Sequence, residues 1–481
     1  MGEAHVGVKG HFFVAAYSMQ GHINPARCLA RRLASIGGPT TAVTMAIPAC
    51  GYRCIFGSDE EADDGAVSYV PFSDGKDDGS WAKDPEERAW MRGECFKNLL
   101  AVVDRLAASG RPVTCVVSTL NMPPAIDVAR ERGIPLAVFW TQPATMLATY
   151  YHYFHGYEEA VVAHAADPAY AARLPGGLRP VRIRDMPSFF TDKANLLSQM
   201  ILRGFRELFQ TIDEKRPLLL VNTFGALEET ALRAIQPYLD VLAVGPMLPP
   251  APAPHGHGDE LEAMHLFRLD GKYMEWLDAQ PAKSVVYISF GSLATYGARQ
   301  AEEILHGLRR CGRPYLWVVR GEGRTEEVDR VLQTAAAGSG AGTGMVVEWC
   351  DQLRVLSHAS VACFVTHCGW NSTLEAVASG VPAVAVPGWS DQSMNARLME
   401  EDWGVGVRAE RDADGVLRGD ELARCVELVM AGDDDAAMKQ ANARLLKAKA
   451  LEAIAADEPL RRFVQRYNQD PSALSTFCFS E

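Results

Sequence analysis

Short segments that are almost entirely apolar alternate with amphipathic stretches along most of this chain. Phe12–Ala16, Val113–Val117 and Ser284–Phe290 are examples of the apolar segments, and their length fits strands that are buried on both faces. Amphipathic stretches such as Ala301–Arg310 separate them and predict helices. The alternation predicts an α/β fold, in which helices cover both faces of parallel sheets.

The length of 481 residues fits two domains better than one, because single hydrophobic cores stop growing well below this size. The clearest boundary is segment 245–270, where several prolines precede a stretch rich in Gly and His. Such segments are extended and semi-rigid. We therefore expect a linker between two compact halves; the alternative is a long surface loop within one domain. The Ala/Gly-rich stretch Thr334–Gly344 is expected to be a mobile loop.

Charge and composition narrow the range of functions. The formal net charge of −13 argues against a general nucleic-acid binder, which needs a basic face. The longest apolar runs have the length of strands, so we expect no membrane span, and residues 1–10 do not resemble a secretory signal. The cysteines are scattered, with no Cys-x-x-Cys pair. We therefore expect reduced thiols, no zinc site and a cytoplasmic location.

Polar residues gather directly after the predicted strand Ala362–Thr366. Gly369 allows a tight turn with close backbone approach, and Asn371 and Ser372 are good caps for the helix that follows. A helix that begins at the carboxyl end of a parallel strand favours phosphate, because its free N–H groups and its dipole attract anions. His367 can donate a further hydrogen bond to a phosphate oxygen.

Four more positions in the C-terminal half carry side chains that can contact a ligand. Glu375, about one turn into the helix, can accept hydrogen bonds from paired hydroxyls, and Asp391 and Gln392 follow another apolar strand. Trp349 offers a flat face for a base. Each residue taken alone is better explained by a capped helix or a packed core. The set as a whole, at strand ends that should converge, indicates a binding site.

These residues and their spacing resemble the signature box of the plant secondary-product (family 1) UDP-glycosyltransferases. The box is matched by Trp349-Cys350-Asp351-Gln352, His358, Thr366–Glu375, Gly380-Val381-Pro382, Pro387 and Asp391-Gln392, and further matches are Gln20–Pro25, Val221–Phe224, Val244–Pro246 and Ser289–Ser292. Tyr151–Gly156 is similar to the subgroup that glucosylates auxin, related carboxylic acids and anthocyanins. Two positions depart from the usual box, Ala362 in place of Gly and Asp351 in place of Pro.

The resemblance implies two facing Rossmann-like domains of the GT-B type, with the donor cleft between them. It implies an N-terminal acceptor-binding domain (1–245), a linker (246–270), a UDP-sugar-binding domain (271–455) and a C-terminal helix that returns to the first domain (456–481). It further implies an inverting hexosyltransferase that uses UDP-glucose as co-substrate, without a cofactor or a metal. We expect a monomer whose partners are a UDP-sugar and a small acceptor, with no nucleic acid or membrane.

The donor contacts implied by the resemblance fall on matched positions. Trp349 would stack on uracil, and Gln352 and Glu375 would contact the nucleoside. Trp370 and Gln392 together favour glucose in this family. The diphosphate would be held by Ser292, His367, Asn371 and Ser372, and the hexose would be contacted by Trp370, Asp391, Gln392 and Thr141.

His22 is the expected general base. It lies in Gln20-Gly21-His22, just after the first predicted strand, and a turn at that end of a strand places side chains in the cleft of an open sheet. Histidine can accept the acceptor's proton near neutral pH; the plain alternative is a structural histidine. An Asp partners this base in the family, but Thr119 occupies the matching position. Threonine does not stabilise a charged imidazolium as a carboxylate does.

This departure suggests a substrate class. A carboxylic acid with a pKa of ~4 is already ionised at pH 7, so an enzyme for such acceptors tolerates Thr119. We predict a preference for carboxylates or acidic phenols over aliphatic alcohols. The rival hypothesis is that Thr119 orients a neutral His22 through its hydroxyl.

The acceptor pocket is expected to be apolar and to come from the N-terminal half. Each candidate is also a natural core residue. The candidates are Met122, Trp140, Met146, Tyr151, Phe154, Phe189 and Phe190.

Three other functions compete with this interpretation. The donor could be a different UDP-sugar, or the protein could bind a UDP-sugar or a hormone with little turnover, which Thr119 would suit. A Rossmann oxidoreductase is disfavoured, because no Gly-x-Gly-x-x-Gly follows a strand and opens a helix.

Overall fold

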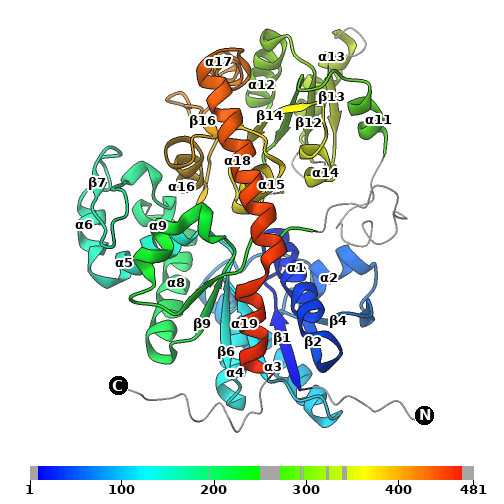
Figure 1. Cartoon of the computed structure of the whole chain (residues 1–481), viewed down its shortest axis with the longest axis vertical. Coiled ribbons are helices and arrows are strands. Elements are labelled where there is room, and N and C mark those ends of the chain that lie inside the picture. The colour runs from blue at the N-terminus through cyan, green and yellow to red at the C-terminus, as the bar shows by residue number, and fades with distance from the viewer. Residues whose placement is uncertain are drawn as a thin grey trace.

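The computed structural model describes residues 9–192, 194–249, 271–292, 295, 297–320, 324–338 and 344–468. Two α/β halves lie one above the other, and each is built on its own sheet (Figure 1). This arrangement confirms the expected pair of Rossmann-like domains. Most of the proposed linker 246–270 lies outside the described residues, as does the part of the proposed Ala/Gly-rich loop from 339 to 343.

The N-terminal half contains an eight-stranded sheet in the order β10-β9-β6-β5-β1-β2-β4-β3, parallel except for the β3–β4 pair. Its strands are β1 (Gly10–Ala15), β2 (Thr41–Pro48), β3 (Ala62–Asp63), β4 (Ser68–Phe72), β5 (Cys115–Thr119), β6 (Leu136–Trp140), β9 (Leu218–Val221) and β10 (Val241–Ala243), and β7 (Ala171–Ala172) and β8 (Val181–Arg182) form a separate pair. The helices are α1 (Gln20–Gly37), α2 (Ala49–Phe56), α3 (Pro85–Ala108), α4 (Pro123–Arg132), α5 (Ala144–His152), α6 (Glu158–Ala163), α7 (Ser188–Thr191), α8 (Leu196–Lys215) and α9 (Gly225–Ile235).

The first strand shows why apolar residues fill every position. Successive side chains of a strand point to opposite faces, so Phe12 and Val14 pack against α1, whereas Phe13 and Ala15 pack against α3 and α4. All four side chains are fully buried. A strand buried on both faces has no position for a polar residue, which is the pattern seen in the sequence.

The C-terminal half contains a six-stranded parallel sheet in the order β13-β12-β11-β14-β15-β16. Its strands are β11 (Val285–Ser289), β12 (Tyr315–Val318), β13 (Gly344–Val347), β14 (Val361–Thr366), β15 (Ala383–Ala385) and β16 (Gly406–Arg408). The helices are α11 (Lys272–Asp278), α12 (Ala298–Cys311), α13 (Glu326–Gly338), α14 (Gln352–Leu356), α15 (Trp370–Ser379), α16 (Gln392–Arg397) and α17 (Gly419–Met430).

Two long C-terminal helices connect the halves (Figure 1). The first, α18 (Asp434–Ala456), runs down from the C-terminal half, and α19 (Glu458–Tyr467) lies against α1 in the N-terminal half. The Phe463 ring of α19 contacts the Phe12 ring of β1, with 5.3 Å between their centroids. The last described helix is therefore part of the N-terminal core.

Two local expectations were wrong. Helix α1 begins at Gln20, with Met19 as its N-cap, so Gln20-Gly21-His22 is the first helical turn and not a loop. Helix α13 continues to Gly338, so the first part of the supposed loop Thr334–Gly344 is helical. Alanine is the strongest helix former, and three consecutive alanines extend this helix past the point where a loop was expected.

Candidate functional site

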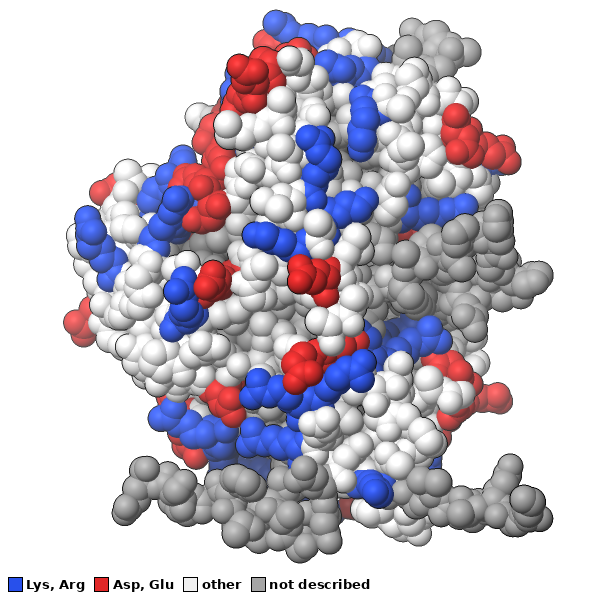
Figure 2. Space-filling view, viewed as in Figure 1, with Lys and Arg blue, Asp and Glu red and all other residues white. Residues whose placement is uncertain are grey.

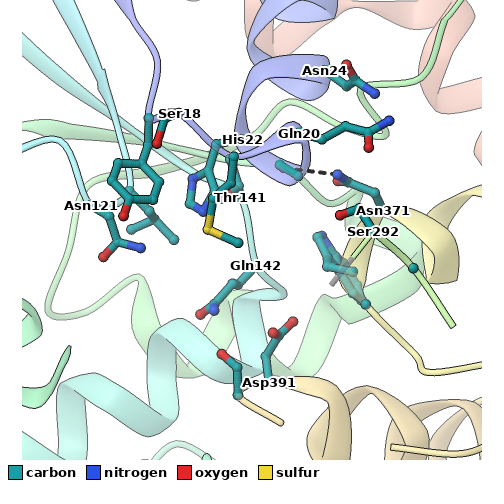
Figure 3. A pocket seen from close by; sticks show the side chains of 18 of the residues that line it. Ser18, Gln20, His22, Asn24, Asn121, Thr141, Gln142, Ser292, Asn371 and Asp391 are labelled. Atoms are coloured by element: carbon teal, nitrogen blue, oxygen red, sulfur yellow. Dashed lines mark hydrogen bonds between the residues drawn. The ribbon is translucent and has the colours of Figure 1, made fainter. Parts of the chain in front are cut away.

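A cleft of about 1900 Å³ lies between the two halves. Its lining includes residues that directly follow β1, β5, β6, β11 and β14, such as Tyr17, Leu120, Thr141, Phe290 and His367. These are the carboxyl ends of parallel strands, where open α/β sheets bind their ligands. Figure 3 shows His22 and Thr141 on one side of this space, and Asn371 and Ser292 on another.

The cleft brings together His22 and all eleven residues that were expected to contact the donor. Phe189 and Met122 also line it. Thr119 and the remaining acceptor candidates do not line the cleft.

A partly buried hydrogen-bond network fixes Glu375 in the C-terminal wall. The Tyr287 hydroxyl donates to Gln352 Oε1 at 3.1 Å, and Gln352 Nε2 donates to Ser372 Oγ at 2.7 Å and to Glu375 Oε2. Burial raises the pKa of Glu375 to about 7, against a smaller opposite effect of the Gln352 hydrogen bond. A carboxylate held in this way has acceptor capacity left for the paired hydroxyls of a ribose.

His367 lies between two glycines at the end of β14. A Cβ atom on either Gly291 or Gly369 would come within 2.5 Å of His367 Nε2, so a side chain at either position would displace the ring, and the φ of 82° at Gly291 further favours glycine there. Burial lowers the pKa of His367 to about 4, so the ring is neutral. Its Nδ1 atom is buried and has no hydrogen-bond partner in the described part of the chain. Because Nδ1 is closed off from the cleft, a ligand would have to meet the remaining part of the partly buried ring.

Helix α15 begins beside this histidine. Its N-cap is Gly369, and no side chain caps the helix, so its first-turn N–H groups remain for an anion. The expectation that Asn371 and Ser372 are caps was wrong, because both lie inside the first turn. Asn371 Nδ2 instead donates to the carbonyl of Gly21 across the cleft at 3.0 Å (Figure 3).

Trp370 also bridges the two halves. Its side chain is 4% exposed, and Nε1 donates to the carbonyl of Asn222 at 2.7 Å. The indole N–H is therefore occupied by the N-terminal half, although the residue borders the cleft. Any contact of Trp370 with a sugar would have to use the rest of the side chain.

Asp391 and Gln392 are held by local hydrogen bonds after β15. Asn395 Nδ2 donates to Asp391 Oδ2 at 2.7 Å, and burial raises the pKa of Asp391. Gln392 Oε1 accepts from the backbone N–H groups of Gly388 and Trp389, at 2.9 and 3.0 Å. This fixes the Gln392 amide and leaves its NH₂ group as the remaining donor.

His22 is in the first turn of α1 and faces the cleft (Figure 3). Its ring meets the Tyr17 ring edge-on, with 5.3 Å between the centroids. Burial lowers the pKa of His22 to about 4, and its Nδ1 atom has no hydrogen-bond partner among the described residues. No described carboxylate therefore orients this imidazole through Nδ1.

Thr119 does not take over that role. It ends β5, is 2% exposed and does not line the cleft. Its Oγ1 atom accepts a hydrogen bond from the backbone N–H of Tyr17 at 3.1 Å and lies 3.5 Å from the Leu120 carbonyl oxygen. The rival hypothesis, in which this hydroxyl orients His22, has no contact to support it.

Five of the seven acceptor candidates lie outside the cleft lining: Trp140, Met146, Tyr151, Phe154 and Phe190. Trp140, Met146 and Phe190 are core residues, and the Phe190 ring stacks on Tyr153 at 3.8 Å. Tyr151 and Phe154 are partly buried against that core, and the Tyr151 ring stacks on the exposed His155 at 4.0 Å. An aromatic side chain near a strand end can point either into the cleft or into the core behind it. The side chains that it packs against decide between the two, and the sequence alone does not show them.

Several cleft residues were missed by the sequence analysis. Gln142, next to Thr141, has a buried Oε1 atom without a partner among the described residues, and it lies between Thr141 and Asp391 in Figure 3. Asn121 has a φ of 63°, a left-handed conformation that suits the turn after β5. Arg88 enters from the distant helix α3. Gln142 could have been predicted, since it follows β6 just as Thr141 does.

No group of three or more His, Cys, Asp or Glu side chains placed to hold a metal ion occurs among the described residues. In that same part of the chain, no helix is both long and apolar enough to cross a membrane. Basic and acidic side chains lie interspersed on the face shown in Figure 2.

Residues 256–445 match the family model described as UDP-glucoronosyl and UDP-glucosyl transferase. The chain is 40% identical to the chloroplastic crocetin glucosyltransferase of Gardenia jasminoides, over 95% of this chain and 97% of that protein. It is 36% identical to anthocyanidin 3-O-glucoside 5-O-glucosyltransferase 1 of Perilla frutescens, over 94% and 96%. The crystal structure of Os79 from O. sativa with UDP superposes with a TM-score of 0.77 at 28% identity, covering 95% of this chain and all of that one.

Proposed function

Because the chain belongs to the UDP-glucuronosyl and UDP-glucosyl transferase family, and is therefore a UDP-glycosyltransferase, we propose that it transfers glucose from UDP-glucose to a small, largely apolar acceptor with inversion. The observation that carries this proposal is the partly buried Tyr287–Gln352–Glu375 network beside the uncapped N-terminus of α15. It provides an acceptor for ribose hydroxyls next to an anion site.

The donor half of the cleft stabilises the leaving UDP. The first-turn amides of α15 and the neutral His367 would donate hydrogen bonds to the diphosphate as its negative charge grows. Trp349 would face the uracil, and Ser292 would approach the diphosphate from the other side. The fixed NH₂ group of Gln392 and the Asp391 carboxylate would contact the glucose.

His22 would serve as the base from the opposite wall. The acceptor oxygen attacks the anomeric carbon, the bond from that carbon to the UDP oxygen breaks, and the acceptor's proton passes to the imidazole. A single displacement of this kind inverts the anomeric configuration. The low pKa of His22 keeps its base form available throughout the physiological range, although such a base is weak.

A weak base without an orienting carboxylate favours acceptors that ionise easily. A carboxylate attacks without losing a proton, and an acidic phenol needs little help. We therefore retain carboxylic acids and acidic phenols as the proposed acceptors, in preference to aliphatic alcohols. The contacts of Thr119 support this choice, because its hydroxyl accepts from the Tyr17 backbone N–H and faces the Leu120 carbonyl, and among the described residues it forms no hydrogen bond with His22.

A protein that binds a UDP-sugar with little turnover is the second candidate. The observation in its favour is the same unpartnered Nδ1 atom of His22. A different UDP-sugar donor is a third possibility within the same chemistry. A cytoplasmic location and a monomeric state complete the proposal; the cysteines of the described part, none of which is in a disulfide, fit a reducing compartment.

The test is UDP release from UDP-glucose, UDP-galactose and UDP-xylose against auxin-like acids, flavonoids and alcohols. We expect UDP-glucose to be the best donor and carboxylates or acidic phenols to be the best acceptors. Faster turnover of alcohols of matched size would refute the acceptor class. Tight binding of UDP-glucose without UDP release for any acceptor would favour the binding protein.

A further inference from the structure

Arg88 is a cation in the cleft wall with no carboxylate partner among the described residues. It lies on α3 and is half-buried, and its Nη1 atom donates to the backbone carbonyl of Met200 on α8 at 2.6 Å. No described Asp or Glu oxygen lies within 4.0 Å of its guanidinium nitrogens. Gly204 leaves room beside it, since a Cβ atom there would come within 2.8 Å of Arg88 Nη2.

The acidic groups near Arg88 are bound to other cations. Arg92 pairs with Asp127 and with Glu207, each at 2.9 Å, and Glu207 also accepts from Arg203. Burial lowers the pKa of Arg88, because its charge is only partly hydrated. An arginine nevertheless stays protonated in proteins. Glu207 acts on this charge only from a distance, and no described carboxylate forms an ion pair with it.

Tyr17 separates this charge from the reaction centre. Its ring packs edge-on against His22, and its phenol lies within electrostatic range of Arg88. Asp74 is the acidic group that faces Tyr17 from another element, and its carboxylate accepts from the backbone N–H of Lys76 at 3.0 Å. Arg88 therefore stands one aromatic ring beyond His22, while the Phe189 and Phe205 rings supply apolar surface to the same cleft.

We propose that Arg88 binds a carboxylate that the acceptor carries in addition to its reacting oxygen. This inference rests on the proposed function, because His22 must mark the position of the reacting oxygen. A planar guanidinium with donors left over is suited to a carboxylate, which it can bind through two parallel hydrogen bonds. The acceptor is then an apolar skeleton with a nucleophilic oxygen at one end and a carboxylate about one ring length away.

The experiment compares 4-hydroxycinnamate with its methyl ester, which offers the same phenol without the carboxylate. The phenolic glucoside is quantified by chromatography, so that any acyl glucose from the free acid is counted separately. For the unmodified enzyme we expect a lower KM for the acid. Arg88→Gln should lower kcat/KM for the acid by about 10- to 100-fold, chiefly through KM, as expected for the loss of a charged hydrogen bond.

Arg88→Gln should leave kcat/KM for the ester and KM for UDP-glucose unchanged. Arg88→Lys keeps the charge and should retain part of the preference. Arg105→Gln is the matched control, since Arg105 is an exposed cation on the same helix that pairs with Glu61 outside the cleft. Arg105→Gln should change kcat/KM for neither the acid nor the ester.

An acid-to-ester ratio that is the same in Arg88→Gln and in the unmodified enzyme would overturn the inference, as would an equal loss for both compounds. Equilibrium binding of each compound in the presence of UDP, followed by tryptophan fluorescence, gives a readout that does not need turnover. Failure of the proposed function would look different: no UDP release from UDP-glucose with either compound, whatever residue stands at position 88.

Discussion

Replacing Glu375 by glutamine should stabilise the free protein and weaken its binding of UDP-glucose. Burial raises the pKa of Glu375 from 4.5 to about 7, so the folded protein resists ionising this carboxyl. An acid with a raised pKa in the folded state reduces stability as the pH rises from 4.5 to about 7, and the cost is complete above that range. Glutamine has the same shape, can accept the Gln352 hydrogen bond and carries no charge.

The magnitude follows from the two pKa values. Their difference, 7 − 4.5 = 2.5, corresponds to about 3 kcal/mol when Glu375 is fully ionised. By the same relation the cost is about 1.4 kcal/mol at pH 5.5, where the carboxyl is largely ionised in the unfolded chain but still protonated in the folded protein. The stabilisation produced by Glu375→Gln should therefore be roughly 2 kcal/mol larger at pH 8 than at pH 5.5.

Thermal unfolding of the ligand-free protein at both pH values measures this difference. A domain of this size shifts its midpoint by roughly 2–4 °C for each kcal/mol. UDP-glucose binding should weaken about 10- to 100-fold at pH 8, because the ribose hydroxyls lose a charged acceptor. Glu302→Gln, an exposed acid on α12, is the control. If Glu375→Gln shifts the unfolding midpoint as little as this control does at both pH values, the raised pKa of Glu375 is refuted.

The remaining predictions concern the base and the contact between the halves. Because burial lowers the pKa of His22 to about 4, kcat/KM for a weakly acidic phenol, measured at saturating UDP-glucose so that ionisation of Glu375 does not limit donor binding, should stay flat from pH 8 to about pH 5 and fall only below that; half-loss near pH 6.5 would contradict this. Thr119→Asp should raise turnover of alcohols roughly tenfold by stabilising the imidazolium, while carboxylate acceptors change little. Asp185 is fully buried and bonded to Arg182 and Arg408, so Arg408→Met should destabilise the protein by roughly 2–3 kcal/mol in a denaturant titration. An unchanged midpoint would show that Arg182 alone satisfies Asp185.

The donor wall could be predicted because its parts lie close together in the sequence. His367 to Glu375 follow one strand and open one helix, so strand ends and helix starts place them without knowledge of the rest of the fold. Their hydrogen-bond partners could not be predicted. Trp370 bonds to Asn222, 148 residues away, and Asn371 bonds to Gly21, 350 residues away.

The acceptor wall was predicted poorly for the same reason. Arg88 and Phe205 come from α3 and α8, and only the packed structure brings these helices to the end of β1. Residue type did not separate Phe189, which lines the cleft, from its neighbour Phe190, which stacks on Tyr153 in the core. Periodicity shows that such residues are buried, but not which side of a short helix faces a ligand.

UDP release from UDP-glucose by the unmodified protein and by His22→Ala tests the central claim most directly. The acceptors should be an auxin-like acid and a phenol of similar size. Our account predicts release with both acceptors, a loss of at least about 100-fold with the phenol in His22→Ala, and a smaller loss with the acid, which has no proton to give up. Undiminished phenol turnover in His22→Ala would contradict the assigned base, and tight UDP-glucose binding without release by the unmodified protein would contradict transfer itself.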